Sequence, residues 1–467
     1  IRMIQKNGHC CPFFYFSSGL AGPIRRLRRS THVPLAPGRP GQRVYATTSS
    51  VLATPSGTAG RPTLVAGSFD RFVNLVPPPK QAVRRSPDSV AVTPKIAQYL
   101  RDSAPATPCL VVDVDRVEQN FRRLKDALPL ARIYYAVKAN PAAPILARLT
   151  GLGSYFDAAS WEEIESCLAA GAQPADISYG NTVKKVSAIK AAHAAGVTMF
   201  AFDSEPELLK IAQHAPGARV YCRILVKNEG AEWPLSRKFG CELEMARDLM
   251  VQARGLGLGP YGISFHVGSQ QTSTAAYEGA IARVAMLFTD LKEAGVKLRM
   301  VNLGGGYPVR YRAEVPAIDD FGMAIMGAMT QHFGNDLPEM VIEPGRFMVG
   351  DAGVVSSEVV LVSRKAKDDP VRWVYLDIGR FGGLAETEGE AIKYAFRTPH
   401  DDGADGPVTI AGPTCDSTDT LYEKSNYRLP LALDCGDRVE LLSTGAYVTT
   451  YASQGFNGFR PLAEHYI

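Results

Sequence analysis

The sequence predicts an α/β fold, namely a (β/α)8 TIM-type barrel followed by a second, mostly antiparallel β domain. Eight short β-branched or aromatic runs alternate with helical stretches through the middle of the chain, as in βα units. Residues suited to cofactor chemistry follow these runs directly, and the C-terminal ends of the strands form the active-site rim of such a barrel. The runs are Ile133–Val137, Ser154–Phe156, Ile177–Tyr179, Met199–Phe202, Val220–Val226, Gly262–Phe265, Met300–Leu303 and Met340–Ile342.

The segments on either side of the barrel have different patterns. Residues 107–113 read as a strand, and residues 115–128 as a helix, because Val117, Phe121 and Leu124 recur at helical spacing. After Asp351 the runs lack long helices between them, which indicates antiparallel β structure. Those runs are Val354–Val362, Trp373–Leu376, Val408–Ile410 and Arg438–Leu442. We expect a basic extension over 1–93, a segment contributing to the β domain over 94–115, the barrel over 116–350 and the β domain over 351–467.

Charge is distributed unevenly along the 467 residues. The net charge is +4, but residues 1–90 hold thirteen Lys and Arg against two acidic residues, which leaves a mildly acidic body. We therefore expect no nucleic-acid partner. The basic stretch is rich in Pro, Gly and Ser without a helical or strand period, so disorder is the first interpretation and an organelle-targeting peptide the alternative.

The eight cysteines include no C-x-x-C pair and no accompanying His cluster. That pattern argues against a metal site or a disulfide framework, so we expect no metal and a reducing, cytoplasmic location. No apolar run reaches the ~18 residues that a membrane span requires, so we expect no membrane partner.

Three residues at run ends could bind a flat, charged cofactor. Lys138 ends the first run, and partial desolvation there would make it a Schiff-base nucleophile; the alternative is a strand-end Lys reaching solvent. Glu343 ends the eighth run and could keep a pyridine nitrogen protonated, or form a structural ion pair with Arg346. His266 ends the sixth run and could stack on a ring, or be a satisfied core residue.

A phosphate cradle is predicted after the seventh run. The glycines of residues 304–306 let backbone N–H groups approach an anion, although a plain turn is an equal alternative. Ser269 and Arg346 could bind the same phosphate. Asp157 and Glu163 could orient the Lys or the His, or could be a cap and a solvated helix face.

The β domain adds a thiol and a carboxylate in a Gly/Pro-bounded loop. Cys415 could deliver a proton and Asp416 could hold a substrate ammonium, although a free Cys is more often a small buried hydrophobe. Tyr447 is uninformative alone. Together, the Lys, the phosphate cradle, the Glu and the His on one rim are the parts that a pyridoxal 5′-phosphate (PLP) site needs.

From about residue 94 to the C-terminus, the chain resembles the fold-type III PLP-dependent decarboxylases, and most closely the ornithine decarboxylases. Residues 233–240 are similar to the version in bacterial lysine/ornithine enzymes. The motifs that carry the resemblance are Tyr135-Ala136-Val137-Lys138-Ala139-Asn140, Phe265-His266-Val267-Gly268-Ser269, Leu303-Gly304-Gly305-Gly306-Tyr307, Glu343-Pro344-Gly345-Arg346, Gly412-Pro413-Thr414-Cys415-Asp416, Gly445-Ala446-Tyr447 and Phe456-Asn457-Gly458-Phe459.

The resemblance implies a role for each position. Lys138 would carry PLP covalently, Glu343 would pair with the pyridine nitrogen and His266 would stack on the ring. Asp157 and Glu163 would support the lysine and ring side. The phosphate would lie among Ser269, Gly305, Gly306, Arg346 and Tyr447.

For the substrate end, the resemblance implies that Cys415 protonates the carbanion after CO2 leaves and that Asp416 binds the distal ammonium. Both would reach the neighbouring subunit's site, which implies a homodimer. Phe381 would lie near the substrate, where eukaryotic ornithine decarboxylases have Tyr. The family's second substrate-binding Asp has no clear counterpart among the nearby acids, which are Glu386, Glu388 and Glu390.

Substrate choice follows from the residue after Cys415. Diaminopimelate decarboxylases carry Cys-Glu and bind a carboxylate, whereas an Asp facing the far end of the substrate favours a terminal ammonium. The expected reaction is decarboxylation of L-ornithine to putrescine and CO2, in polyamine biosynthesis. Lysine differs by one methylene, worth ~1–3 kcal/mol, so side activity is expected. The alternatives are diaminopimelate decarboxylase, an amino-acid racemase, or a non-catalytic homologue with a regulatory binding role.

Overall fold

The computed structural model describes residues 91–226, 230–233 and 238–467. All of them belong to one unit, Pro78–Ile467. The predicted disorder or targeting role of residues 1–90 lies outside these ranges, as do four residues of the 233–240 motif.

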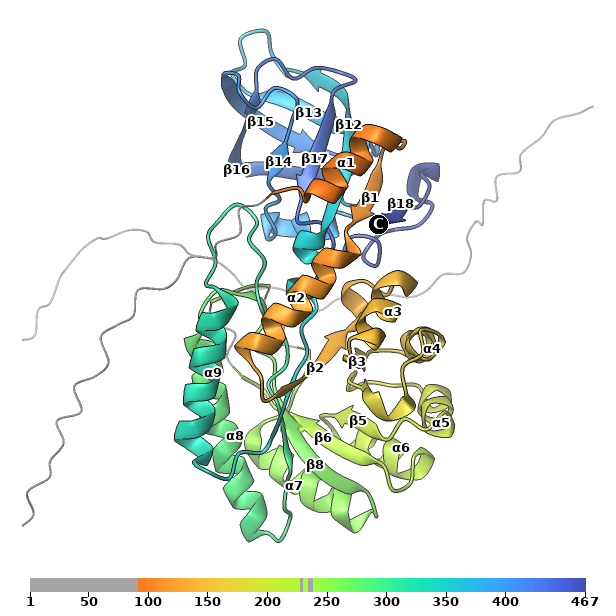
Figure 1. Ribbon diagram of the computed structural model, residues 1–467, viewed down its shortest axis with the longest axis vertical. Helices are drawn as coiled ribbons and strands as arrows, with labels where there is room; N and C mark the ends of the chain where they lie inside the picture. The colour runs from red at the N-terminus through yellow and green to blue at the C-terminus, as the bar shows by residue number, and fades with distance from the viewer. Residues whose placement is uncertain (1–90, 227–229, 234–237) are drawn as a thin grey trace, which may run out of the picture. The chain divides into compact units, whose positions relative to one another are not determined.

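Eight parallel strands close into a barrel in the lower part of the molecule (Figure 1). Each strand hydrogen-bonds to two neighbours, and the ring closes between β10 and β8. The strands are β2 (Ala131–Ala136), β3 (Tyr155–Ala158), β4 (Ile177–Tyr179), β5 (Met199–Phe202), β6 (Arg219–Arg223), β8 (Gly259–Ser264), β10 (Met300–Asn302) and β11 (Glu339–Ile342).

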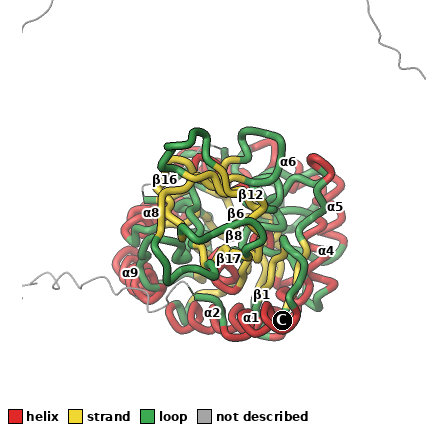
Figure 2. The backbone as a smooth tube through the Cα atoms, turned by 90° about the horizontal axis from the view of Figure 1, so that it is seen from above, coloured by secondary structure: helices red, strands yellow, loops and turns green. Residues whose placement is uncertain are grey.

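A helix follows each barrel strand, and the longer helices surround the strands when the molecule is seen from above (Figure 2). They are α3 (Ala143–Gly151), α4 (Trp161–Ala169), α5 (Val186–Ala194), α6 (Glu205–His214), α7 (Leu243–Gly255), α8 (Ala275–Glu293), α9 (Ile318–Phe333) and the short α10 (Arg346–Val349). Four 3-10 turns accompany the barrel or the start of the next domain: η1 (Val137–Ala139), η2 (Pro174–Asp176), η3 (Gly350–Ala352) and η4 (Ala385–Glu390).

The helix α2 (Val114–Ala127) leads into the barrel and contacts α3, α9 and α10. Asp113 caps it by accepting a hydrogen bond from the Asp115 N–H at 3.0 Å. Val117, Phe121 and Leu124 are buried on one face, as their spacing predicted.

Alternating strand residues fill two different parts of the core. One set packs inside the barrel as a small cluster, and the residues between them face the helices. The barrel is therefore a packed body whose chemistry must lie at its ends. The inner cluster comprises Tyr134, Met199, Ala201, Tyr221, Met300 and Val341.

The second domain is an eight-stranded sheet in which seven strands follow the barrel in sequence and one, β1, precedes it. Two pairings, β13 with β15 and β1 with β18, are parallel and the others are antiparallel. The strands are β1 (Cys109–Val112), β12 (Gly353–Ser363), β13 (Arg372–Leu376), β14 (Phe396–Arg397), β15 (Asp405–Ala411), β16 (Thr420–Pro430), β17 (Arg438–Leu442) and β18 (Ala463–Tyr466). The remaining elements are α1 (Pro94–Ser103), η5 (Phe456–Gly458) and a ribbon of β7 (Ala231–Trp233) with β9 (Ser269–Gln271).

The predicted fold class is confirmed. Each of the eight predicted runs contains or overlaps a barrel strand, and the predicted strand near residue 110 pairs with β12. Three sheet strands, β14, β16 and β18, were not predicted from the sequence. Among the described residues, no helix combines the length and hydrophobicity needed to cross a bilayer.

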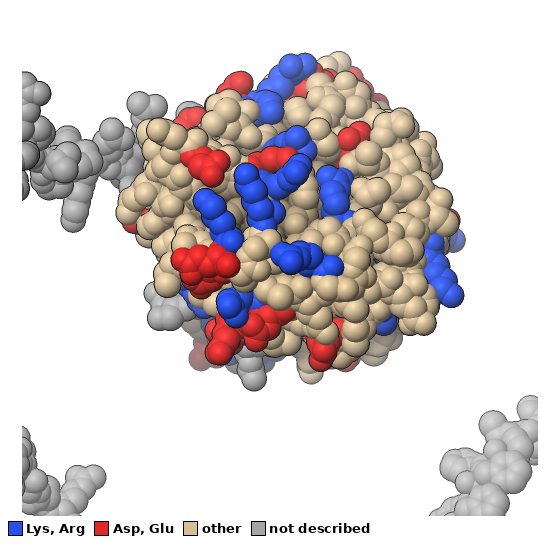
Figure 3. Space-filling view, turned by 90° about the horizontal axis from the view of Figure 1, so that it is seen from below, with Lys and Arg blue, Asp and Glu red and all other residues tan. Residues whose placement is uncertain are grey.

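The barrel end opposite the second domain is covered by interspersed basic and acidic side chains (Figure 3). Arg132 near the start of β2 pairs with Glu339 at the start of β11 at 3.0 Å, and Arg219 at the start of β6 lies 4.8 Å from the Tyr261 ring. In these contacts the charged side chains at the N-terminal ends of the strands have partners among their neighbours. Candidate chemistry therefore concentrates at the other end.

Candidate active site

Lys138 lies in the turn η1, directly after β2, on the C-terminal rim of the barrel. Its Nζ is 3.3 Å from Asp157 Oδ2, and Asp157 is the second-last residue of β3, the neighbouring strand. The Lys138 side chain is 47% exposed, whereas that of Asp157 is 6% exposed. Burial lowers the pKa of Lys138, but Asp157, Tyr447 and Glu343 outweigh it, so the net pKa is raised. The ammonium is thus held charged by a ring of acidic groups.

Glu343 lies just after β11, the strand that pairs with β2 on the other side from β3. Asn302 at the end of β10 donates to Glu343 Oε1 at 2.5 Å and accepts from the Gly304 N–H at 2.9 Å. Burial and the nearby Asp157 carboxylate raise the pKa of Glu343 to about 7, against the opposing effect of Lys138. This carboxyl group can therefore exchange a proton near neutral pH.

The alternative Glu343–Arg346 ion pair is wrong. Arg346 begins the helix α10 and directs its guanidinium at Glu386, with Nη2–Oε1 at 2.6 Å and Nη1–Oε2 at 2.7 Å. Its Nη1 also donates to the Tyr311 hydroxyl at 2.7 Å. Glu343 and Arg346 are three residues apart across a turn, and their side chains point in different directions. The Glu343 carboxyl group is therefore not neutralised by Arg346.

His266 follows β8 and accepts a hydrogen bond at Nδ1 from the Gly268 N–H at 3.0 Å. Burial lowers the pKa of His266 well below its usual value, and the neighbouring cations Arg223 and Lys138 lower it further. The imidazole is therefore neutral at physiological pH. A neutral, flat ring at this place can stack on an aromatic ligand.

The glycine turn after β10 forms a cradle that no other residue could form. A Cβ at Gly305 would lie 2.4 Å from the Glu343 carbonyl oxygen and 3.5 Å from His266 Nε2. Gly306 has φ +111°, and a Cβ there would lie 2.5 Å from the Gly268 carbonyl oxygen. The backbone of this turn is thus pressed directly against the rim, with no room for a side chain.

Arg346, Ser269 and Tyr447 gather beside this cradle. Ser269 Oγ accepts from Arg346 Nη2 at 3.1 Å, and the guanidinium lies 4.9 Å from the Tyr447 ring centroid. Tyr447 comes from the second domain, and its N–H donates to the Ala139 carbonyl at 2.9 Å, next to Lys138. The predicted phosphate residues are therefore brought together with the predicted lysine.

Glu163 has a structural contact as well as its place near the rim. Its carboxylate accepts the Ala159 N–H at 2.6 Å, while Ser160 Oγ accepts the Glu163 N–H at 3.2 Å, which is a helix-capping arrangement. Burial raises its pKa, and the Lys138 ammonium acts in the opposite direction. The side chain thus caps α4 and faces the lysine.

Cys415 and Asp416 lie apart from this group in the same chain. Cys415 is exposed, and its N–H donates to Asn457 Oδ1 at 3.0 Å. Asp416 accepts from the Thr418 N–H and hydroxyl at 2.8 and 2.7 Å, which lowers its pKa. Within the described part of the chain, neither side chain has a hydrogen bond or ion pair with the barrel rim. Phe381 likewise stacks on Phe456, centroids 4.4 Å apart, in the second domain.

Sequence reasoning missed three residues of the site, Asn302, Arg223 and Tyr311, and it also missed the pairing of Glu386 with Arg346. Asn302 ends β10, so its place just before the predicted glycine turn was a usable signal. Arg223 ends β6 and could have been found in the same way. Glu386 and Tyr311 lie on connecting segments, and only the folded chain brings them to Arg346.

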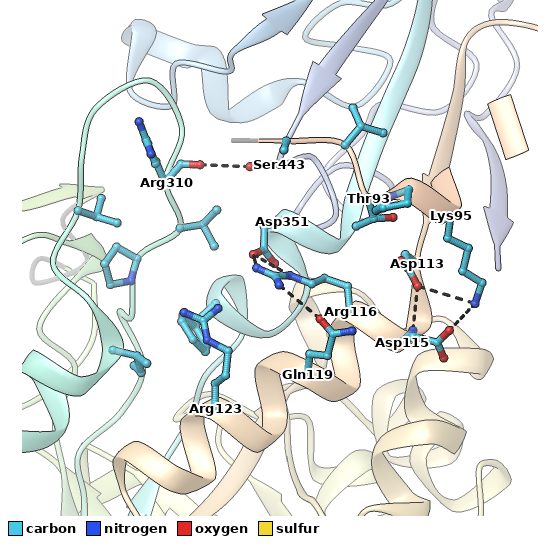
Figure 4. Close-up of a pocket in the computed structure, with 18 of the residues that line it drawn as sticks. Thr93, Lys95, Asp113, Asp115, Arg116, Gln119, Arg123, Arg310, Asp351 and Ser443 are labelled. Carbon is cyan, nitrogen blue, oxygen red and sulfur yellow. Dashed lines mark hydrogen bonds and ion pairs between the residues drawn. The ribbon is translucent and has the colours of Figure 1, made fainter. Parts of the chain in front are cut away.

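A cavity lies away from the rim (Figure 4). It has a volume of about 510 Å³ and is lined by α2, the segment before α1 and the loop after β10. Its Arg116 pairs with Asp351 at 2.6 Å and its Lys95 with Asp115 at 2.6 Å. Lys138 does not line it, so this cavity is separate from the rim site.

The rim residues fit PLP in their chemistry. An amine, a carboxyl group with a pKa near 7 and a neutral imidazole lie beside a glycine cradle that a Cβ would fill. The Ser269 hydroxyl and the Arg346 guanidinium add donors suited to a phosphate.

Comparisons with known proteins give the same result. The family described as pyridoxal-dependent decarboxylase, pyridoxal binding domain, matches residues 114–350. The lysine/ornithine decarboxylase of Selenomonas ruminantium is 37% identical over 355 residues, covering 76% of this chain and 88% of that protein.

Two solved structures share the fold. The lysine decarboxylase SrLDC in complex with PLP and cadaverine has a TM-score of 0.73 and 35% identity, covering 81% of this chain and 94% of that chain. The lysine/ornithine decarboxylase of Vibrio vulnificus complexed with putrescine has a TM-score of 0.71 and 29% identity, covering 80% and 97%. The chain therefore belongs to the pyridoxal-dependent decarboxylase family and is a PLP-dependent decarboxylase of basic amino acids.

Proposed function

We propose that this enzyme decarboxylates L-ornithine to putrescine and CO2, with side activity on L-lysine. The observation that carries the proposal is the Cys415-Asp416 pair, which places a carboxylate beside the candidate proton donor. A carboxylate attracts a terminal ammonium and repels a second carboxylate. Relatives crystallised with putrescine and with cadaverine support the same class of substrate.

Six rim residues would hold the cofactor. Lys138 Nζ would form the covalent bond to it. Ser269, Arg346 and Tyr447 would bind its phosphate together with the backbone of the glycine cradle at Gly305 and Gly306. The close approach of this backbone to the rim, with no room for side chains, supports that placement.

Glu343 and His266 would set the protonation of the ring. When bound, PLP supplies an electron sink for the pair released as the carboxylate leaves. A pKa of about 7 lets Glu343 share a proton with a basic ring nitrogen, and Asn302 fixes the orientation of its carboxyl group. Neutral His266 would cover one face of the ring and exclude water. Asp157 and Glu163 would orient the Lys138 amine by charge.

At the other end of the substrate, Asp416 would bind the side-chain ammonium. Cys415 would donate its Sγ proton to the carbon that lost CO2, which balances the exchange of a carboxylate for a hydrogen. Phe381 would line the aliphatic part of the substrate.

We also propose a homodimer in which Cys415 and Asp416 of the partner subunit complete the site around Lys138. Their exposure and their lack of contact with the described rim support it. Mixing Lys138→Ala and Cys415→Ala proteins, each strongly impaired alone, should restore about a quarter of wild-type activity, because half of the dimers are then mixed and carry one intact site. No recovery after subunit exchange would contradict the shared site.

Substrate preference is tested by CO2 release from ornithine, lysine and meso-diaminopimelate. We expect kcat/KM to be highest for ornithine, about 10–200-fold lower for lysine and at least roughly 10³-fold lower for diaminopimelate. Preference for diaminopimelate would overturn the proposal. Asp416→Asn should lower kcat/KM for ornithine while leaving cofactor absorbance unchanged.

The proposed location is the cytoplasm. The six cysteines in the described ranges are all free thiols, which suits a reducing compartment. Fluorescence localisation of the full chain and of a chain lacking residues 1–90 tests it, since organellar signal from the full chain alone would support the targeting alternative.

A further inference from the structure

A buried carboxylate joins the two loops of the second domain that carry the proposed substrate residues. Asp419 is 3% exposed. Its Oδ1 accepts from the Arg380 N–H at 2.7 Å, and its Oδ2 accepts from the Thr414 N–H at 3.1 Å and the Thr414 hydroxyl at 2.8 Å. Its backbone also bonds to both ends of one loop, donating to the Asp416 carbonyl at 3.0 Å and accepting from the Gly412 N–H at 2.7 Å.

Both loops press directly against this carboxylate. A Cβ at Gly379 would lie 2.1 Å from Asp419 Oδ1, and a Cβ at Gly412 would lie 2.4 Å from Oδ2. Either distance is shorter than any that real Cβ atoms adopt, so a side chain at either position would displace the carboxylate or the loop. The two glycines and the carboxylate therefore form a fitted set rather than a chance contact.

The loops fixed in this way carry the residues proposed for the substrate. The first continues from Arg380 into Phe381, which stacks on Phe456 at an interplanar angle of 25°. The second continues from Thr414 into Cys415 and Asp416. Asn457, next to Phe456, accepts the Cys415 N–H, so the two loops also meet through η5.

We propose that Asp419 is a positioning residue that sets the register of the Cys415–Asp416 loop against the Phe381 loop. This inference rests on the proposed function, because Asp419 acts through Cys415 and Asp416. The charge of the Asp419 carboxylate matters because its three partners, two backbone N–H groups and the Thr414 hydroxyl, all donate to it. A carboxylate accepts hydrogen bonds on both oxygens. An amide of the same shape offers one acceptor oxygen, so its NH2 would face a donor in either orientation.

The first test is Asp419→Asn in the full-length holoenzyme. A misplacement of about 1 Å costs roughly 10²-fold, so we expect that loss in kcat/KM for ornithine, mostly in kcat. Cofactor absorbance and content should stay at wild-type values, since Asp419 does not touch the rim. The matched control is Asp401→Asn, because Asp401 accepts the Thr398 N–H and hydroxyl in the same domain. Wild-type kinetics are expected for the control.

A double-mutant cycle separates positioning from general destabilisation. If Asp419 acts through Cys415, Asp419→Asn should change kcat less than about threefold in a Cys415→Ala background. Independent, multiplicative losses would overturn the proposal. If Asp419→Asn does not fold, Thr414→Val removes one of the three hydrogen bonds with little change in shape and should show the same pattern at smaller size.

Alkylation of Cys415 provides a readout that does not depend on turnover. Iodoacetamide labelling, followed by peptide mass spectrometry, should show the Cys415 rate changed about threefold or more by Asp419→Asn, with Cys435 unchanged. An unchanged Cys415 rate would overturn the positioning role. If wild-type enzyme fails to decarboxylate ornithine, the proposed function fails, whereas the labelling result still decides the role of Asp419.

Discussion

The barrel rim and the Cys415 loop differ in how much of their environment a single chain supplies. Lys138 and Glu343 follow neighbouring strands of the barrel, so their charged groups lie close together. Burial and this proximity shift the pKa values of both side chains. Cys415 is exposed, and its loop is held by its own domain through Asn457 and Asp419. The difference teaches that one chain supplies the surroundings of the barrel-rim residues, whereas the Cys415 loop, the substrate end in the proposed function, is exposed in a single chain.

The largest expected effect is at the rim. Lys138→Ala removes the amine proposed to bind the cofactor, so kcat/KM for ornithine should fall by roughly 10⁴-fold or more. The measurement is CO2 release together with the visible absorbance of the bound cofactor. Exposed Lys190 on α5 is the control, and Lys190→Ala should keep both properties. Full turnover in Lys138→Ala would break the assignment of the rim as the reaction centre.

Next in size is Glu343→Gln, which keeps the shape but removes the exchangeable proton. A decade of rate corresponds to ~1.4 kcal/mol, and we expect a loss of about three decades in kcat. Glu339→Gln is a matched control, because Glu339 begins the same strand at the opposite end of the barrel and pairs with Arg132. Equal losses in the two variants would mean that the rim has no special chemistry.

The third prediction concerns stability of the cofactor-free protein against pH. Because the folded pKa of Glu343 is about 7, above its unfolded value, the folded state binds the proton more tightly between about pH 4.5 and 7. The stabilising contribution is present below that window and is lost as pH rises through it. The unfolding free energy of the wild type should therefore fall relative to Glu343→Gln by roughly 1–3 kcal/mol across the window. Denaturant titrations at several pH values measure this, and a pH-independent difference would contradict it.

The smallest expected effect on kinetics is at Phe381, in the second domain. Phe381→Ala removes a ring stacked on Phe456, an interaction worth about 0.5–1.5 kcal/mol. We expect KM for ornithine to rise about 3–10-fold with little change in kcat or cofactor content. Phe381→Tyr, the residue of eukaryotic relatives, should stay near wild type. A loss of cofactor from Phe381→Ala would show that the two regions are not separate.

The barrel could be predicted because parallel strands buried on both faces leave short, nearly continuous apolar runs. Their ends also marked Lys138, Asp157, His266 and Glu343 as neighbours, since parallel strands finish at one edge. The contacts of Arg346 could not be predicted, because Glu386 lies forty residues away on a 3-10 turn and reaches it only after the second domain packs on the barrel. Strand β16 was missed because charged and polar residues interrupt its apolar pattern at Glu423 and Lys424.

Tyr447 shows how far the two domains depend on each other. The matched family region ends at residue 350, yet the Tyr447 N–H binds the Ala139 carbonyl, and Asn140 donates to the Gly445 carbonyl at 3.1 Å. A fragment that ends at residue 350 would keep all eight barrel strands. It would lose the contacts that Gly445 and Tyr447 make at the C-terminal rim. A truncated protein engineered to bind a vitamin-B6 cofactor should therefore include the segment that contains Gly445 and Tyr447 as well as the barrel.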